Sequence, residues 1–465
     1  MNPTPDPSDP LKAWEQALRA AFGPNADAII EQMRASGVDM AELMRQSEAL
    51  QANPQMLDMI MRQAATFLAA DPHDPVNAPL AKNIARQVTS SLGPDPSMTD
   101  ADQRAVRNIF SACELWLDVA TTLPPATVSA HAWSRAEWVE ATISTWESLT
   151  SPVAGAVASA LTQLFRDEAI ADATIDPAGG FAPDSVLRSM ASAAFGMQVG
   201  QATGELAAEV FGTTDVGIPL VDTQTVAMVI KNVDEFAAGL DSPRDEVRHF
   251  LAVREATAAR LFASVPWLRA HVRALVDEYA RGVVIDREAL EETLRDVDPS
   301  NIEAIRQAMS GGIFAVPTTS DQKATLARLE TVLALIEGWV DTVSTQAAIP
   351  HLRSVVSLRE MMRRRRAAGG PAEQTFAKLV GLELRPRRAR EAAALWELLH
   401  ARCGVDGRDQ VWDHPDFLPE GTDLDDPHAF VERWSNGPTA STDDVDAALS
   451  AIFAEADRDD GQSQD

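Results

Sequence analysis

The chain has 465 residues and 45% hydrophobic side chains, enough to bury a sizeable core in one large domain or in two to three smaller ones. Its formal net charge is −29, which argues against general binding to nucleic acid, because phosphate neutralisation needs clustered basic side chains. Only two cysteines are present, Cys113 and Cys403, so a disulfide framework is not expected and the reducing cytoplasm is the expected location.

The first part of the chain is predicted to form a small helical module, residues 1–70. Apolar residues recur there at helical spacing in DPLKAWEQALRAAFG and NPQMLDMIMRQAATFLAA. The chain starts without the basic and apolar stretches of a secretory signal. Residues 71–98, which include DPHDPVNAP, are predicted to be a linker.

Residues 99–435 are predicted to form one large domain, and its pattern is helical almost throughout. The predicted fold class is therefore all-α or nearly so, with GGIFAVPTT (311–319) as the best candidate for a short extended segment. The longest apolar stretch, VAGAVASALTQLF, is too short to span a membrane, so no membrane association is expected. Residues 436–465 are predicted to be an acidic, disordered tail with room for one short helix.

Three glycines recur every four residues in SAAFGMQVGQATGELAAEVFG, at Gly196, Gly200 and Gly204. This spacing places small residues on one helix face and lets a second helix approach closely. Because the segment also carries polar and acidic residues, close packing inside a soluble domain is predicted rather than packing in a membrane.

The stretch VREATAARLFASVPWL (253–268) has the form of a metal-binding helix without its ligands. In an H-E-x-x-H motif, ligands four residues apart lie on one helix face, and the glutamate beside the first acts as general base. Glu255 takes the place of that glutamate, whereas the two ligand positions hold Arg254 and Ala258. Neither side chain offers an atom that binds zinc at neutral pH.

A basic region extends from Arg353 to Arg390 in an otherwise acidic chain. It could bind an anionic partner, either phosphate or an acidic segment of a protein, including this chain's own. The alternative is a solvated surface that balances acidic neighbours, which is the usual role of such charge runs. An unknown protein partner is therefore one possibility for this region.

A second group of candidate ligands lies in LLHARCGVDGRDQVWDH, where His400, Cys403 and His414 fall close together. A metal site here would need Asp413 or Asp416 as its fourth ligand, and the spacing matches no standard zinc module. Ordinary structural roles are favoured for all three residues.

Other residues near these candidates are predicted to be structural. Gly404 is expected to terminate a helix, and Cys403 to be a small buried hydrophobe. His249 lies six residues before Glu255, on a different part of the helix face, and His271 lies beyond a proline. A histidine near Glu255, whether His249, His271 or His351, would favour an enzyme.

Long blocks of the sequence resemble the actinobacterial zincin-like family known as DUF2342, whose members are described as zinc-dependent metalloproteases or hydrolases. The resemblance covers roughly residues 100–435. The blocks that carry it are DEVRHFLAVREATAARLFASVPWLRAHV, LALIEGWVDTVSTQA, RRRRAAGGPAEQTFAKLVGLELRPRRAREAAALW and WDHPDFLPEGTDLDDPHAFV. The resemblance implies a zincin-like helical domain.

The resemblance also implies where a zinc site would lie, and this chain departs from it there. Zinc-binding members have H-E-x-x-H and a third histidine in an E-G-H motif. The corresponding positions here are Arg254, Ala258 and Trp339, and of the catalytic set only Glu255 remains. No metal or other cofactor is therefore expected, whereas members that keep the histidines would hold zinc.

Arg254 could replace the charge of the missing ion. In that hypothesis its guanidinium pairs with Glu337 or Asp341 of the EGWVD segment, while Trp339 fills the volume left by the histidine and the metal. The alternative places Arg254 on the surface and Glu255 in an ordinary pair with a neighbour one helical turn away.

The function expected from the sequence is that of a catalytically degenerate zincin-like protein, acting in the cytoplasm as a binding or scaffold partner. The alternative is an active zinc-dependent metallopeptidase-type hydrolase that uses Glu255 as general base with a rebuilt metal site.

Overall fold

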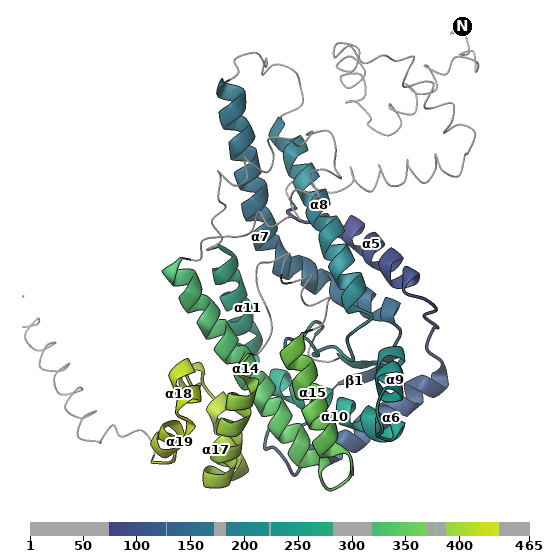
Figure 1. Ribbon diagram of the computed structural model, residues 1–465, viewed down its shortest axis with the longest axis vertical. Coiled ribbons are helices and arrows are strands. Elements are labelled where there is room, and N and C mark those ends of the chain that lie inside the picture. The colour runs from purple at the N-terminus through teal and green to yellow at the C-terminus, as the bar shows by residue number, and fades with distance from the viewer. Residues whose placement is uncertain are drawn as a thin grey trace, which may run out of the picture.

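Helix α10, Arg244–Ser264, is buried on all sides over most of its length, and every residue from Phe250 to Phe262 is shielded from solvent. A helix buried all round belongs to the centre of a domain. Many residues in this stretch are alanines, which let neighbouring helices approach its backbone. Figure 1 shows α10 among α6, α9, α14 and α15 in the lower half of the molecule.

The nearly all-α fold predicted from the sequence is confirmed. In the computed structural model 74% of the described residues are helical and 4% lie in strands. The described residues are 74–126, 128–171, 183–222, 225–281, 319–369, 377 and 387–436. The predicted module 1–70, nearly all of the predicted tail and most of the extended candidate 311–319 lie outside them.

The other helices are α5 Ala78–Ser91, α6 Asp100–Leu117, α7 Arg135–Ala171, α8 Pro183–Leu206, α9 Ile230–Ala238, α11 Pro266–Arg281, α14 Ser320–Ala348, α15 Val355–Ala368, α17 Ala389–Asp409, α18 Gly421–Asp425 and α19 Pro427–Ser435. Two short 3-10 turns, Gln410–Trp412 and Pro415–Phe417, follow α17. No helix in the described ranges is both long and apolar enough to cross a membrane.

Helices α5 and α8 pack closely along the glycine stripe, as its spacing predicted. A Cβ atom at Gly196 would lie 2.7 Å from the carbonyl oxygen of Asn77, and one at Gly204 would lie 2.6 Å from Cβ of Val88. Only glycine allows such an approach. The segment 71–98, predicted as a linker, thus contains a helix that packs on the domain. Its start is capped by the side chain of Asn77, which accepts from the backbone N–H of Leu80.

Two short strands, which the sequence analysis did not predict, form a parallel pair. Strand β1, Ser129–Trp133, pairs with β2, Thr225–Val229. Gly212 adds an isolated antiparallel bridge to Met228 of β2. This bridge holds the loop before β2 against the sheet, directly beside α10.

Helix α14 lies between two groups of helices. It packs against α10 and α11 on one side and against α17 on the other (Figure 1). A Cβ atom at Gly338 would lie 2.6 Å from the backbone nitrogen of Ala393, so this glycine sets the close approach of α14 to α17. Helix α15 follows α14 and lies over it and α10. Gly404, predicted to terminate a helix, instead interrupts α17 with φ of 74°, and helical residues follow it up to Asp409.

Candidate functional site

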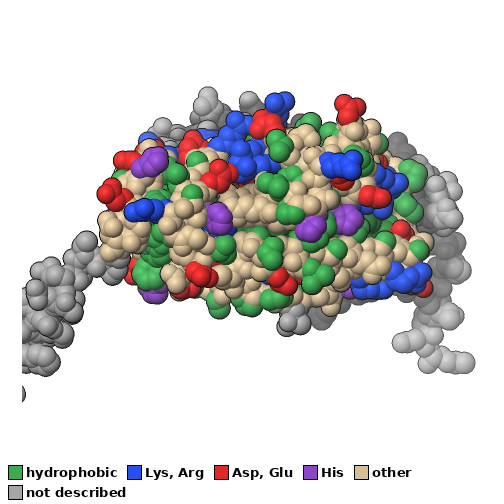
Figure 2. All heavy atoms as spheres, turned by 90° about the horizontal axis from the view of Figure 1, so that it is seen from below, with side chains coloured by type: hydrophobic (Ala, Val, Ile, Leu, Met, Phe, Trp, Pro, Cys, Tyr) green, Lys and Arg blue, Asp and Glu red, His purple; other side chains and the backbone are tan. Residues whose placement is uncertain are grey.

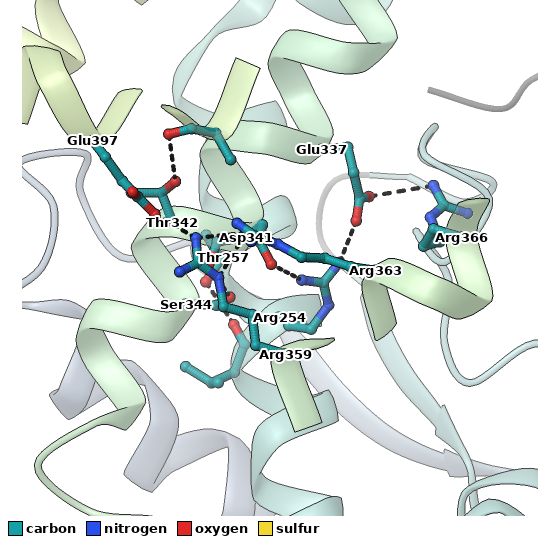
Figure 3. Close-up of polar contacts among 12 residues, drawn as sticks. Arg254, Thr257, Glu337, Asp341, Thr342, Ser344, Arg359, Arg363, Arg366 and Glu397 are labelled. Carbon is teal, nitrogen blue, oxygen red and sulfur yellow. Dashed lines mark hydrogen bonds and ion pairs between the residues drawn. The ribbon is translucent and has the colours of Figure 1, made fainter. Parts of the chain in front are cut away.

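Arg254 lies on the side of α10 that faces α14, and its guanidinium contacts two acidic residues there (Figure 3). One terminal nitrogen is 2.5 Å from Oε1 of Glu337, and the other is 3.6 Å from Oδ1 of Asp341. Glu337 and Asp341 are four residues apart and therefore share a face of α14. The structure thus places Arg254 beside both of the acids that the sequence offered as alternative partners.

Helix α15 adds three more guanidinium groups to the same two carboxylates. Arg359 and Arg363 both bind Oδ2 of Asp341, at 2.8 and 2.7 Å. Arg366 lies 3.3 Å from Oε2 of Glu337. We call these three side chains, with Arg254 and the two acids, the arginine–carboxylate network.

The network also reaches the loop before β2, because Arg366 donates to the backbone carbonyl of Asp215. Its members are shielded from water to different degrees: the Asp341 side chain is 5% exposed, Arg254 9%, and Arg363 25%. Charged groups therefore connect three helices, α10, α14 and α15, and the loop before β2 at one place. A buried carboxylate among cations is a costly arrangement unless its partners are all present.

Glu255 points away from this network toward the loop before β2. Its Oε1 accepts from the backbone N–H of Thr213 at 2.7 Å and from the Thr213 hydroxyl. Its Oε2 accepts from the N–H and the hydroxyl of Thr214, at 3.2 and 2.7 Å. Four donors occupy the four lone-pair positions of the carboxylate. Burial raises the pKa of Glu255, and the threonine hydrogen bonds act against this rise.

Gly212 is needed for this arrangement. A Cβ atom at Gly212 would lie 2.5 Å from Oε2 of Glu255 and 2.9 Å from the carbonyl oxygen of Ala227. Any larger residue would push the loop off the carboxylate. Sequence reasoning missed Gly212, Thr213 and Thr214, because the loop FGTTD is 42 residues away from its partner and carries no motif.

A cavity of about 40 Å³ lies between Glu255 and Glu337. Ala258, the second ligand position of the metal-helix pattern, lines it, as do Arg254 and Met362. Such a space holds a water molecule or two, since one water needs roughly 10–15 Å³ by this measure. It is far smaller than the sites of several hundred Å³ that hold small-molecule ligands.

Trp339 was expected to fill the space beside Arg254, and this prediction is wrong because its side chain packs near Asp409 and Trp412. Its indole N–H donates to Oδ1 of Asp409 at 3.0 Å, and its ring packs edge-on against Trp412. Because it follows Glu337 by two residues, it points to nearly the opposite side of α14. The residue of the EGW motif that faces Arg254 is Glu337.

Asp409 is a buried acid that sequence reasoning did not single out. It accepts from Trp339, from the neighbouring Arg408 at 2.7 Å, and from Thr121 at 2.6 Å and Thr122 at 2.9 Å. It therefore fastens the end of α17 to α14 and to the loop after α6. The only signal was the dipeptide RD in a helical pattern, which is too common to be informative.

A model of the zincin-like metallopeptidase family matches residues 76–431, which is more than half of the sequence. The chain belongs to this family. A solved structure from Chloroflexus aurantiacus, described as a "putative hydrolase with a novel fold", is similar with a TM-score of 0.53 and 18% identity. The match covers 77% of this chain and 98% of that one, and at this identity it concerns the fold alone. Among proteins of curated function none matches.

The residues at the site of this zincin-like protein do not fit the zinc ion that the family name implies. Glu337 and Asp341 are neutralised by arginines, and Glu255 is fully hydrogen bonded. Alanine at 258 supplies no donor atom. Across the described residues, no group of three or more His, Cys, Asp or Glu side chains is placed to hold a metal.

Three histidines could have favoured an enzyme by approaching Glu255, and each contacts a tryptophan ring instead. His249 and His351 stack on the two-ring system of Trp116, with ring centroids 5.5 and 4.4 Å from it. His271 contacts Trp267 edge-on. Figure 2 shows histidines on the lower end of the molecule, where several reach the surface. Their placement gives no reason to assign Glu255 a histidine partner.

His400, Cys403 and His414 do not assemble as a ligand group either. His414 begins a short turn, where its ring nitrogen accepts from the backbone N–H of Asp416. Cys403 is half-buried on α17, one residue before Gly404. Both cysteines are free thiols.

Proposed function

We propose that this zincin-like protein works without a catalytic metal and acts as a binding or scaffold protein in the cytoplasm. The observation that carries the proposal is the contact between Arg254 and Glu337. It places a permanent cation, rather than a metal ligand, on the helix face that a zincin would use.

A guanidinium at this place opposes metal binding in two ways. Its charge repels a divalent cation, and it occupies the carboxylate that would otherwise be free to coordinate one. A bound ion would have to displace Arg254 from Glu337 and leave that guanidinium, 9% exposed, without its closest partner. Desolvated charges without partners cost several kcal/mol.

The state of Glu255 supports the same proposal. A general base must reach the proton of an attacking water within hydrogen-bond distance. The Glu255 lone pairs are already directed to Thr213 and Thr214. Its carboxylate thus has a structural role that keeps the loop before β2 on α10.

The alternative, an active hydrolase with Glu255 as base and a rebuilt metal site, has one observation in its favour. Glu255 and Glu337 line the same cavity, so a conformational change in α15 and the adjacent loop would expose two carboxylates together. It would also have to enlarge a cavity of about 40 Å³ enough to admit a peptide.

The test is the metal content of protein purified without chelators, followed by titration with zinc in a calorimeter. We expect substoichiometric zinc and no saturable binding near neutral pH. The matched control is the double variant Arg254→His and Ala258→His, which restores two imidazoles four residues apart opposite Glu337. That variant is expected to bind zinc saturably under the same conditions, unlike the unmodified chain.

Stoichiometric zinc in the unmodified protein, removed by Glu255→Gln combined with Glu337→Gln, would contradict the proposal. Hydrolysis of peptide substrates that disappears with the same double variant would establish the alternative. Thermal unfolding of each variant checks that the loss of zinc is not a loss of fold.

A further inference from the structure

Helix α15 divides the predicted basic region into two sets of arginines. The inner set, Arg359, Arg363 and Arg366, is turned toward the molecule and bound to Asp341 and Glu337. These residues balance the chain's own buried acids. They are therefore not free to bind another molecule.

The outer side of α15 is different. Val356, Glu360 and Arg364 follow one another at four-residue spacing and so form one stripe. Val356 is 75% exposed and the Arg364 side chain 71%. Arg390, at the start of α17, is 60% exposed and shares Glu360 with Arg364, so two guanidinium groups rely on one exposed carboxylate.

This surface combines apolar and basic character. Met361 lies next to the stripe and is 36% exposed. This surface has exposed aliphatic side chains and more arginines than carboxylates. It would fit a helix that has an apolar stripe flanked by acidic side chains.

The chain itself contains such a segment after its last described helix. In residues 441–465, eight acidic side chains accompany a single arginine, Arg458. Within 443–457 the apolar residues Val445, Leu449, Ile452 and Phe453 follow the spacing of one helix face. Three aspartates open the segment, where acidic residues favour the helix dipole.

The segment also begins within reach of α15. Trp434, near the end of α19, donates to the carbonyl of Gly407 on α17 at 2.8 Å. Ten residues earlier on α17, before the interruption at Gly404, Glu397 pairs with Arg359 of α15 at 2.6 Å. The six residues 437–442 can span up to about 20 Å when extended.

The lengths agree as well. Helix α15 has 14 residues and is therefore about 21 Å long. A helix over 443–457 would have nearly the same length. We propose that residues 443–457 bind as an amphipathic helix to the outer side of α15, with the apolar stripe on Val356 and Met361 and the carboxylates beside Arg364 and Arg390.

The experiment is hydrogen–deuterium exchange by mass spectrometry on the full chain. Amides in 443–457 should exchange at least tenfold more slowly than in the variant Arg364→Glu with Arg390→Glu. Both residues are exposed, so the substitutions leave the core intact. The matched control is Arg104→Glu with Arg107→Glu, two exposed arginines on α6, which should leave the protection unchanged.

A second variant tests the other partner. Leu449→Asp with Phe453→Asp should remove the protection and increase exchange in α15. High salt should weaken the protection, because exposed charges are screened.

Three results would overturn the proposal. They are no protection of 443–457 in the full chain, protection that survives the Arg364 and Arg390 reversals, and protection that vanishes on dilution together with a dimeric mass. The last result would assign the surface to the same segment of a second copy. None of these outcomes depends on the metal content, so the proposal is tested separately from the absence of zinc.

Discussion

Arg254 and Glu337 are both largely buried, so each charge depends on the other for compensation. Glu337 is 12% exposed and has Arg254 on one oxygen and Arg366 on the other. The variant Glu337→Gln would leave two largely buried guanidinium groups with less negative charge nearby. We expect the free energy of unfolding in urea to fall by about 3 kcal/mol.

The control for this prediction is Glu140→Gln. Glu140 is 36% exposed and pairs with Lys82 and Arg86 at the surface. Pairs of this kind contribute at most about 1 kcal/mol. Equal losses in the two variants would mean that the arginine–carboxylate network has no special role in stability.

Glu255 gives a prediction about pH. Burial raises its pKa above the ordinary 4.5 in the folded chain, so folding favours the protonated form. The stability that this provides is complete below pH 4.5 and is lost as the pH rises through the folded-state pKa. The wild type should therefore lose stability relative to Glu255→Gln as the pH rises above 4.5 in urea titrations.

Glu140 provides a comparison of opposite sign. Burial raises its pKa, but hydrogen bonds from Arg86 and Lys82 outweigh this and lower the pKa overall. Its stabilising contribution is present at neutral pH and is lost on acidification. As the pH rises, the wild type should become more stable relative to Glu140→Gln. If the stability of the wild type relative to each of the two variants changed with pH in the same way, the assignment for Glu255 would be contradicted.

At the scale of elements, the contact between α5 and α8 depends on residues without side chains. A Cβ atom at Gly200 would lie 2.8 Å from Cβ of Ile84. Gly200→Ala should therefore lower the thermal midpoint, with a cost of about 1–3 kcal/mol from overpacking. Gly155→Ala in α7 is the control. Its added Cβ would meet Pro75 at an ordinary 3.6 Å, so helix propensity should make the change neutral or stabilising.

Some elements of the site followed from the sequence and others did not. The charges of Arg254, Glu337 and Asp341 suggested that the arginine pairs with one of the two acids, and the structure places it beside both. Helical periodicity could have shown that Trp339, two residues from Glu337, points away from the side of α14 that faces Arg254. The loop carrying Thr213 could not be assigned, because its role depends on contact with a helix distant in sequence.

The two strands and helix α5 escaped prediction for different reasons. Strands β1 and β2 have five residues each and pair across almost 100 residues, so neither shows a long alternating pattern. Helix α5 follows a stretch rich in proline and aspartate, which favoured a linker. Tertiary contact with the glycine face of α8 decides its place in the fold.

At the scale of the whole molecule, the described part of the core and the family match both lie within residues 74–436. We expect a chain limited to these residues to unfold cooperatively, with a midpoint close to that of the full chain. A chain that starts at residue 99, the predicted domain boundary, lacks α5 and would expose the glycine face of α8. Its midpoint should fall by more than 10 °C in calorimetry, and an unchanged midpoint would show that α5 is dispensable.

The hydrogen bond from the Thr121 hydroxyl to Asp409 joins residues that are 288 positions apart in the sequence. A ribosome makes about 5–20 residues per second, so roughly 15 to 60 seconds separate the two ends of this bond during synthesis. Until Asp409 leaves the exit tunnel, the loop after α6 and the indole of Trp339 both lack their acceptor. The hydrogen bonds to Asp409 can therefore form only after nearly all of the domain has been synthesised. Packing between the first and the last helices of the domain is completed late in synthesis.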